Sequence, residues 1–279
     1  MTLTISSRAA YALISNGLHN IAIAQVILFA IILAVQFPMR YMQEWRYWHH
    51  SKRQSHARCA LYSWWSMIGL LCMIRIIGSA MVISTSEPTE SMLTAEMSLQ
   101  SVGLSPLFFE VSLLLLRCGQ AGQVGPGNSK YPKPLRITLH AFRLPIIISI
   151  ILGVVGKIID MKALGEAGSI LLIVTFAVVC GIVSWLVVKS RSMLSVEGHR
   201  AVLLVALALP FLLIRVIYFV LQEIGPAKFS LASGEVGILA GMGLVMEVII
   251  VSLLVTARAV AEPIWSTERK ISDGMECGV

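Results

Sequence analysis

Long apolar runs alternate with short polar connections along the whole chain. Seven of these runs approach ~20 residues, the length at which an α-helix crosses a bilayer. They lie near residues 18–37, 60–83, 92–117, 136–157, 168–189, 200–222 and 236–258. Because the connections are short, neighbouring helices should run antiparallel. We therefore expect a single all-α domain over residues 1–279, an integral membrane bundle of seven transmembrane helices.

The composition points the same way. Hydrophobic residues make up 57% of the chain and charged residues 13%, and the mean hydropathy is +0.81, whereas soluble domains carry about 25% charged residues. The formal net charge of +7 does not indicate a nucleic-acid partner, because the basic residues lie in connections, where membrane orientation explains them. The five cysteines include no CxxC pair, which argues against a disulfide framework or a zinc site.

Basic residues gather on one side of the predicted bundle. The first, third and fifth connections and the C-terminal tail hold 15 Lys and Arg residues, Arg40 and Arg258 among them, against four on the other side. Since Lys and Arg are enriched in cytosolic connections, the N-terminus should face the lumen or exterior and the C-terminus the cytosol. The first residues hold one Arg and no small-residue cleavage site, so we expect the first run to act as a signal anchor.

The third run carries a polar stripe on an otherwise apolar helix. Glu96 and Glu110 are 14 residues apart, which returns a helix to within about 40° of the same direction. Gln100 and Gly103 fall on the same stripe. An ionisable group that faces hydrocarbon at mid-bilayer costs about 3 kcal/mol or more, so the stripe should face protein or water. We expect it to line a polar chamber inside the bundle.

Two arginines lie too deep in their runs to reach the membrane surface easily. Arg75 in the second run and Arg215 in the sixth both fall in the half nearer the lumen, and Tyr218 shares the helical face of Arg215. Each arginine needs a carboxylate or carbonyl partner. Glu247, the only charged residue inside the seventh run, is the natural shared partner of both. These four residues are therefore candidates for catalysis.

Glu110 is a further catalytic candidate and lies nearer the cytosolic side. We expect it to pair with Arg143 or His140, which share a face of the fourth run, and the alternative is that this pair is purely structural. Other polar residues at chamber depth are candidates for substrate binding: Glu96, Gln100, His19, Asn20 and His140. The alternative for Glu96 is a place among the lipid headgroups.

Two carboxyl groups in such a chamber suit acid–base catalysis. A carboxyl group buried without a partner favours its protonated form and can act as an acid, whereas one held ionised by arginine can act as a base or stabilise a cation. This chemistry suits protonation of an epoxide or alkene and attack by water, an internal hydroxyl or a double bond. The substrate would be a lipophilic small molecule that enters from the membrane lipids. No cofactor is expected, since the sequence has neither a DDxxD-type aspartate cluster for a metal nor a Gly-rich phosphate loop.

Three stretches in the second, third and fourth runs carry a family resemblance: MIRIIGSAM, SVGLSPLFFEVSLLLLR and LHAFRLPIIISIILGVVG. They resemble a poorly characterised family of fungal seven-helix integral membrane proteins that accompany secondary-metabolite pathways. The resemblance implies an endoplasmic-reticulum enzyme that hydrolyses or cyclises an epoxide made by a preceding pathway oxygenase. The resemblance assigns no catalytic residue in this chain. The candidate residues are therefore chosen only by their depth in the membrane and their helical face.

Two other classes of membrane protein compete with the enzyme interpretation. A receptor has the same topology, but the third run ends LLLLRCG without an acidic-Arg-aromatic triplet, and the seventh run lacks an NPxxY-like ending. The seventh run has no lysine for a Schiff base, which argues strongly against a retinal protein. A small-molecule transporter is consistent with intramembrane Glu and Arg residues, although no internal repeat is visible.

Overall fold

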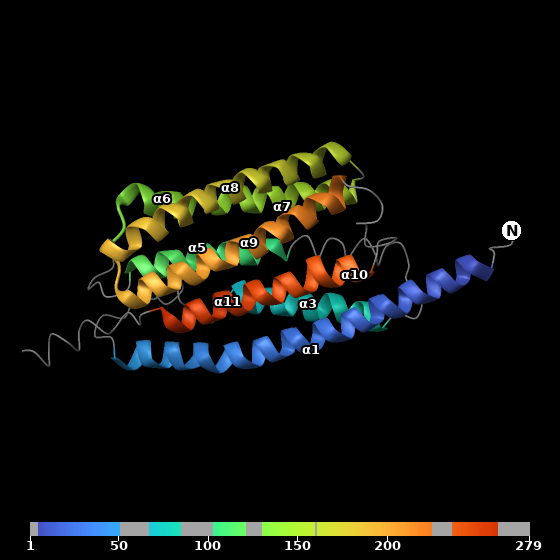
Figure 1. Cartoon of the computed structure of the whole chain (residues 1–279), viewed down its shortest axis with the longest axis horizontal. Helices are drawn as coiled ribbons and strands as arrows, with labels where there is room; N and C mark the ends of the chain where they lie inside the picture. Colours follow the sequence, from blue (N-terminus) through green and yellow to red (C-terminus); the bar gives the residue numbers. More distant parts are fainter. Residues whose placement is uncertain are drawn as a thin grey trace, which may run out of the picture.

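The computed structural model describes residues 5–50, 67–84, 103–120, 130–159, 161–224 and 236–261. Within these ranges all regular structure is helical, as the apolar runs predicted. The helices, shown in Figure 1, are α1 (Ile5–His50), α3 (Met67–Ser84), α5 (Leu104–Gln120), α6 (Lys133–Ala141), α7 (Arg143–Ile158), α8 (Lys162–Met193), α9 (Val196–Ile224), α10 (Val236–Ile238), η2 (Leu239–Val245) and α11 (Met246–Val260).

Six stretches in the described part of the chain are helical, long and apolar enough to cross a membrane. They are His19–Met42, Met67–Ser84, Lys133–Gly156, Ala163–Met193, Val196–Gln222 and Ala240–Val260. The outward faces are apolar too: Ile27, Ile31 and Val35, one turn apart on α1, are all more than half exposed. Water-soluble proteins rarely expose such contiguous apolar surface, whereas acyl chains accept it. The helices therefore fit a membrane bundle.

The third predicted span is only partly described. Residues 92–102, which include Glu96 and Gln100, lie outside the described residues, and the remainder forms α5, which is 17 residues long. α5 contacts α3, α6, α7, α9 and α11, and Figure 1 shows it between the α7–α8 pair and the layer of α3 and α11. Every position from 103 to 119 is buried or half-buried. The described part of the run, α5, is thus enclosed by the other helices of the bundle.

Several predicted boundaries differ from the observed ones. The predicted fourth span breaks at Phe142 into α6 and α7, because Pro145 has no backbone N–H and its ring crowds the carbonyl one turn earlier. In contrast, α1 continues through Pro38 to His50 and α9 continues through Pro210. Arg40 therefore lies in a helix, where the sequence had suggested a connection.

A glycine brings α7 and α8 into close contact. A methyl group in place of the Gly168 hydrogen would lie 2.7 Å from the backbone oxygen of Ser149. The Ser149 hydroxyl donates a hydrogen bond to the Gly168 carbonyl at 2.6 Å. Small residues allow helix backbones to approach closely inside a membrane, where apolar side chains gain little by leaving lipid.

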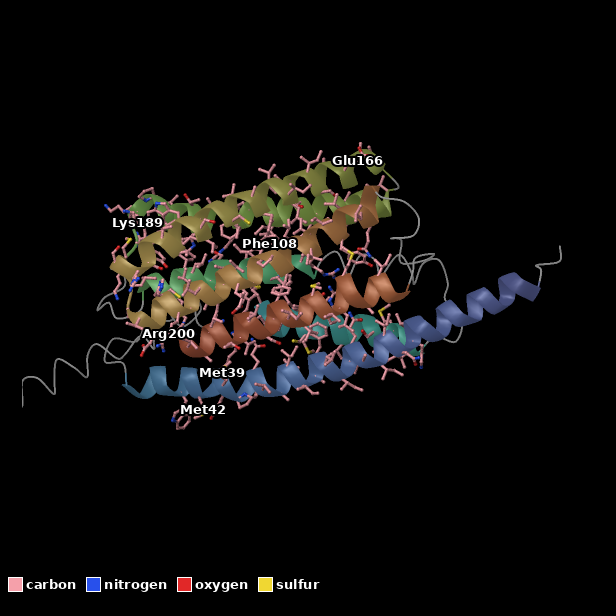
Figure 2. The ribbon with its side chains drawn as sticks, in the orientation of Figure 1. Met39, Met42, Phe108, Glu166, Lys189 and Arg200 are labelled. Atoms are coloured by element: carbon pink, nitrogen blue, oxygen red, sulfur yellow. The ribbon has the colours of Figure 1, made fainter. Side chains whose placement is uncertain are left out.

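Charged residues lie at both ends of the bundle. Figure 2 shows Lys189 and Arg200 at one end, near the C-terminal part of α1, and Glu166 at the opposite end. The orientation of the bundle in the membrane, with a lumenal N-terminus and a cytosolic C-terminus, stays a prediction.

Candidate functional site

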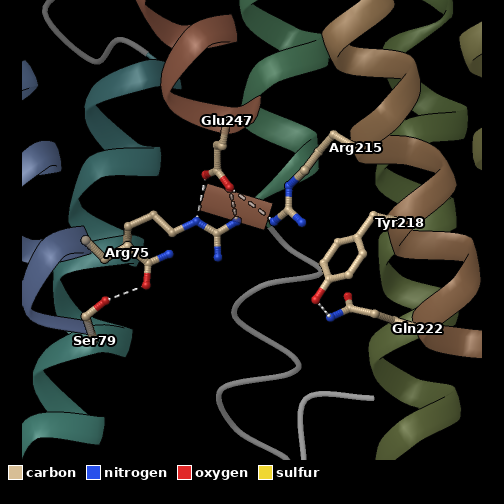
Figure 3. A network of polar contacts seen from close by, with 7 residues as sticks. Arg75, Ser79, Arg215, Tyr218, Gln222 and Glu247 are labelled. Atoms are coloured by element: carbon tan, nitrogen blue, oxygen red, sulfur yellow. Dashed lines mark hydrogen bonds and ion pairs between the residues drawn. The ribbon is translucent and has the colours of Figure 1, made fainter. Parts of the chain in front are cut away.

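Glu247, in the first turn of α11, lies at the centre of a buried ion-pair network (Figure 3). Arg75 of α3 donates to both of its oxygens, with Nε 2.7 Å from Oε1 and Nη2 2.7 Å from Oε2. Arg215 of α9 donates from Nη2 to Oε2 at 3.1 Å. Both arginines are 3% exposed and Glu247 is 1% exposed. The predicted pairing of Glu247 with both arginines is therefore confirmed.

Tyr218 lies beside this network on α9, as the spacing from Arg215 predicted. The Arg215 guanidinium carbon is 5.5 Å from the centroid of the Tyr218 ring, within the range of a cation–π contact. Gln222, one turn further along, donates a hydrogen bond from Nε2 to the Tyr218 hydroxyl at 3.0 Å. The hydroxyl oxygen accepts this bond, so its own hydrogen points away from Gln222.

Gly103, at the start of α5, makes room for the Arg75 guanidinium. A methyl group in place of its hydrogen would overlap Nη2 of Arg75 and lie 2.9 Å from Cζ. Such distances are far inside van der Waals contact, so any side chain at this position would displace the guanidinium from Glu247. The sequence had placed Gly103 on the polar stripe, and this contact explains why the stripe includes a residue without a side chain.

A second polar contact lies next to the network, between α1 and α3. The Ser79 hydroxyl, one turn after Arg75, donates to Oε1 of Gln25 at 2.9 Å (Figure 3). His19 and Asn20, predicted to bind substrate from the same helix, are exposed instead. They lie about 240° and 140° around α1 from Gln25, so they face away when Gln25 faces Ser79. The expectation that these two residues line the chamber is wrong; their role in substrate binding stays a prediction.

The register of α11 places Glu247 inward. Its buried positions follow a stripe of three- and four-residue steps: Glu247, Ile250, Val251, Leu254, Ala257 and Arg258. The preceding segment η2 is a π-helix that includes Gly241 and Gly243. A π-helical turn holds more residues than an α-helical one, so it rotates the following helix relative to the preceding one, and such turns are frequent at functional sites. η2 thereby sets the direction in which Glu247 points.

Glu110 of α5 forms a second buried network, but not with the predicted partners. Its Oε1 accepts hydrogen bonds from Nη2 of Arg40 on α1, at 3.4 Å, and from Nη1 of Arg258 on α11. Glu110 is fully buried, and both arginines are 4% exposed. The network therefore joins three helices, and the expected partners Arg143 and His140 take no part in it.

Arg143 bonds elsewhere because it faces another side of α5. Its Nε donates to the hydroxyl of Ser112 at 3.0 Å, and that hydroxyl donates to the backbone oxygen of Leu139 at 2.8 Å. Ser112 follows Glu110 by two residues, about 200° around the helix. His140 is exposed, so the expectation that it lines the chamber is also wrong.

Sequence reasoning missed Arg40 and Arg258, which it counted among the basic residues of connections. A signal for each was present. Arg258 follows Glu247 by 11 residues and Arg40 follows the buried Gln36 by four, spacings that return to nearly the same helical face. Continuing the helical faces of Glu247 and Gln36 beyond the predicted ends of their spans would have included Arg258 and Arg40.

Two atoms of the Glu247 network can each form one more hydrogen bond with a ligand. A carboxylate can accept about four hydrogen bonds, and Glu247 accepts three from the described residues, which leaves a position on Oε1. Arg215 Nε, a buried donor, has no hydrogen-bond partner in the residues that the structure covers. The site thus offers an acceptor on an ionised carboxylate and a donor on a guanidinium. Among the described residues no cluster of three His, Cys, Asp or Glu side chains could hold a metal ion.

Residues 16–260 match the model of a family described as a domain of unknown function (DUF7702). The chain belongs to this family. No curated protein and no solved structure matches it. The DUF7702 match begins within α1 and ends at the last residue of α11, so the domain contains both buried networks.

Proposed function

We propose that this protein is an integral membrane enzyme that opens an epoxide on a lipophilic substrate, by hydrolysis or by cyclisation. The observation that carries the proposal is the Glu247 network: an ionised carboxylate held by Arg75 and Arg215 inside an apolar bundle, with Tyr218 alongside. Burying three charged side chains is costly. A site that must stabilise charge as a bond breaks gains from fixed charges in a dry environment.

Each group has a distinct part in the reaction. The Nε–H of Arg215 donates a hydrogen bond to the epoxide oxygen and weakens its bond to carbon. Water attacks the carbon as this bond breaks, and the oxygen takes its electron pair and a proton from the Tyr218 hydroxyl. Glu247 holds the attacking water at the remaining Oε1 position and accepts its proton. That proton then returns to the Tyr218 oxygen, which leaves a diol and the original enzyme.

The same groups support cyclisation. An internal hydroxyl or a double bond of the substrate replaces water as the nucleophile, and Glu247 accepts the proton that the product loses. Positive charge that develops on carbon during the opening is stabilised by the carboxylate. The choice between hydrolysis and cyclisation then depends on which nucleophile lies nearest the epoxide carbon.

The cellular setting is part of the proposal. The substrate enters from the membrane lipids, since the outward surface of the bundle is apolar. The predicted orientation puts the N-terminus in the lumen and the C-terminus in the cytosol, in the endoplasmic reticulum. The resemblance to fungal seven-helix proteins supports a role in secondary metabolism, where an oxygenase would supply the epoxide.

The test is product analysis with purified full-length protein in lipid nanodiscs. The substrates are a panel of epoxidised polyenes and terpenoids, and the control variant is Glu166→Gln, the same substitution at an exposed position on α8. We expect wild type and Glu166→Gln to give diols, cyclic ethers or carbocyclic alcohols, and Glu247→Gln to be at least ~100-fold slower. Absence of turnover across the panel, or full activity of folded Glu247→Gln, would remove the proposed function.

A small-molecule transporter is the second candidate. The observation in its favour is that two carboxylate–arginine networks lie at different heights along α11, as in relays that pass a solute or proton along a bundle. Measuring solute uptake into sealed proteoliposomes distinguishes a transporter from an enzyme. Uptake without chemical change of the solute favours the transporter, and product formation without a gradient favours the enzyme.

A further inference from the structure

A basic stripe follows one side of α6 and continues onto the first residue of α7. Its members occur at steps of three or four residues: Lys133, Arg136, His140 and Arg143. Phe142, between the two helices, has a right-handed helical backbone (φ −68°, ψ −11°), so the helical spacing continues across the break. At ~100° per residue the stripe is about 80° wide. Residues 130–159 contain no Asp or Glu, so these helices do not compensate the positive charge of the stripe.

The basic stripe borders the side of α6 that packs into the bundle. Leu139 is fully buried and marks that side. Arg136 and Arg143 lie within about 60° of Leu139 and are half-buried. Lys133 and His140 lie further round the helix and are exposed. The stripe therefore passes from the edge of the bundle interior to the outer surface.

The side chain of Arg143 is held close to the preceding turn of helix. Its Nε lies 3.0 Å from the hydroxyl oxygen of Ser112, and that hydroxyl donates to the backbone oxygen of Leu139, four residues before Arg143. Side chains on a helix also tilt toward its N-terminus, which here means toward Arg136. Both arginines are near enough to His140 to act on it electrostatically. The positive charges of the stripe are therefore gathered near one another.

Arg143 differs from the arginines of the two ion-pair networks. Each of those contacts a carboxylate, whereas Arg143 contacts the neutral hydroxyl of Ser112 and has no ion pair among the described residues. Its Nη2 has no hydrogen-bond partner in that part of the chain either. A charged side chain within a membrane span needs an opposite charge or the membrane surface. Because Arg143 is only half-buried, an anion outside the bundle can approach it.

An apolar track continues from the basic stripe along the outward face of α7. Leu144, Ile148 and Ile151 are 63%, 50% and 53% exposed. Steps of four and three residues keep them within about 60° of one another. A phospholipid has the same order of groups, with a charged head above apolar chains. An acidic peptide or a nucleic acid would match the cations alone, so the surface favours a lipid.

We propose that the basic stripe binds the headgroup of an anionic phospholipid, with a phosphate between Arg136 and Arg143 and further negative charge beside Lys133. Guanidinium groups bind phosphate oxygens through paired hydrogen bonds, and lysine acts as a point charge. A zwitterionic headgroup carries a cation that Lys133 repels. Lys189 and Arg200 lie at the end of the bundle where α6 begins, which adds to the attraction for anionic lipids (Figures 1 and 2). In the predicted orientation this is the cytosolic leaflet.

The experiment is a binding titration of purified full-length protein in non-ionic detergent. Bound lipid is counted by native mass spectrometry, and the thermal unfolding midpoint is followed in parallel. The probes are dioctanoyl phosphatidylinositol 4-phosphate, dioctanoyl phosphatidylcholine, and inositol 1,4-bisphosphate, which is the anionic headgroup without acyl chains. We expect the anionic lipid to bind at least ~10-fold more tightly than phosphatidylcholine and than the free headgroup, because only the anionic lipid matches both the cations and the apolar track.

Substitutions in the stripe test where the lipid binds. Lys133→Gln and Arg136→Gln should each weaken binding of the anionic lipid ~5-fold, and the double variant ~20-fold or more. Arg143→Lys keeps the charge but loses the planar guanidinium, so it should also weaken binding. Arg200→Gln is the control, because it removes an exposed positive charge at the same end of the bundle but on α9, and it should bind nearly as wild type does.

Three results would overturn the lipid site. Equal affinity for the anionic lipid and phosphatidylcholine would show that the stripe does not select negative charge. Undiminished binding in the Lys133→Gln/Arg136→Gln variant, or an equal loss in Arg200→Gln, would show that the lipid is not held by the stripe. Binding of inositol 1,4-bisphosphate as tight as that of the lipid would assign the stripe to a soluble phosphate compound. None of these measurements depends on epoxide turnover, so the lipid site and the proposed function are tested independently.

Discussion

Replacing Glu247 by Gln should destabilise the bundle as well as stop its chemistry. The variant keeps the shape of the side chain and removes its charge, so Arg75 and Arg215 lose the carboxylate that both of them bind. Neither guanidinium can reach water, because both are almost fully buried. The expected effect is therefore large even though the substitution is nearly isosteric.

The magnitude follows from the hydrogen bonds that this substitution weakens. Removing one partner of a buried ion pair costs about 3–5 kcal/mol, and Glu247 accepts three charge-assisted hydrogen bonds from two arginines. The upper end of that range is expected. At about 2–4 °C per kcal/mol for a chain of this size, the thermal unfolding midpoint should fall by on the order of 10–20 °C.

A triple variant separates the structural from the catalytic role of the network. Arg75→Met, Glu247→Leu and Arg215→Met together replace all three charges by apolar side chains of similar volume. Such replacements of a whole buried ionic cluster are often neutral or stabilising. We expect the triple variant to regain most of the midpoint that Glu247→Gln loses, and to have no epoxide turnover.

The assay is thermal unfolding of purified protein in nanodiscs, followed by tryptophan fluorescence, with turnover measured on the same preparations. An unchanged midpoint for Glu247→Gln would show that Glu247 does not neutralise the two arginines. A triple variant with wild-type turnover would refute the catalytic proposal. The network would then have only a structural role, in holding α3, α9 and α11 together.

Two glycines give further predictions. Gly103→Ala should displace the Arg75 guanidinium and lower turnover at least ~10-fold, whereas Gly181→Ala, where nothing lies within 4 Å of the new methyl group, should leave turnover unchanged and is the control. If Gly103→Ala is fully active, Arg75 is not positioned by α5. Gly168→Ala should push α8 away from the α7 backbone and lower the unfolding midpoint, with a cost of roughly 1–3 kcal/mol. An unchanged midpoint would mean that α7 and α8 tolerate a wider separation.

The pairing of Glu247 with Arg75 and Arg215 was predictable because the sequence offered these arginines one suitable carboxylate. Arg75 and Arg215 lie too deep to reach headgroups, and the seventh run offers one carboxylate, so the sequence alone led to Glu247 as the shared partner. The cost of a lone charge in an apolar environment makes that inference strong. The place of Tyr218 followed from local helical spacing, which does not depend on how helices pack.

The partners of Glu110 were not predictable by the same reasoning. Several arginines and a histidine lie at comparable depth, and the choice among them depends on which face of α5 meets which helix. Ser112 and Glu110 point to opposite sides of α5, so Arg143 meets one and Arg40 and Arg258 meet the other. The same reasoning explains why His19, Asn20 and His140 face outward.

The sequence by itself determined that the chain forms apolar helices that fit a membrane, and that its buried charges must meet, because hydrocarbon tolerates neither an open backbone hydrogen bond nor an unpaired charge. Only the tertiary structure decided which charges meet. Helix rotation and tilt, the break at Phe142 and the register set by η2 determine the faces that oppose one another. These depend on side-chain packing between segments far apart in the chain, which periodicity within one helix does not specify.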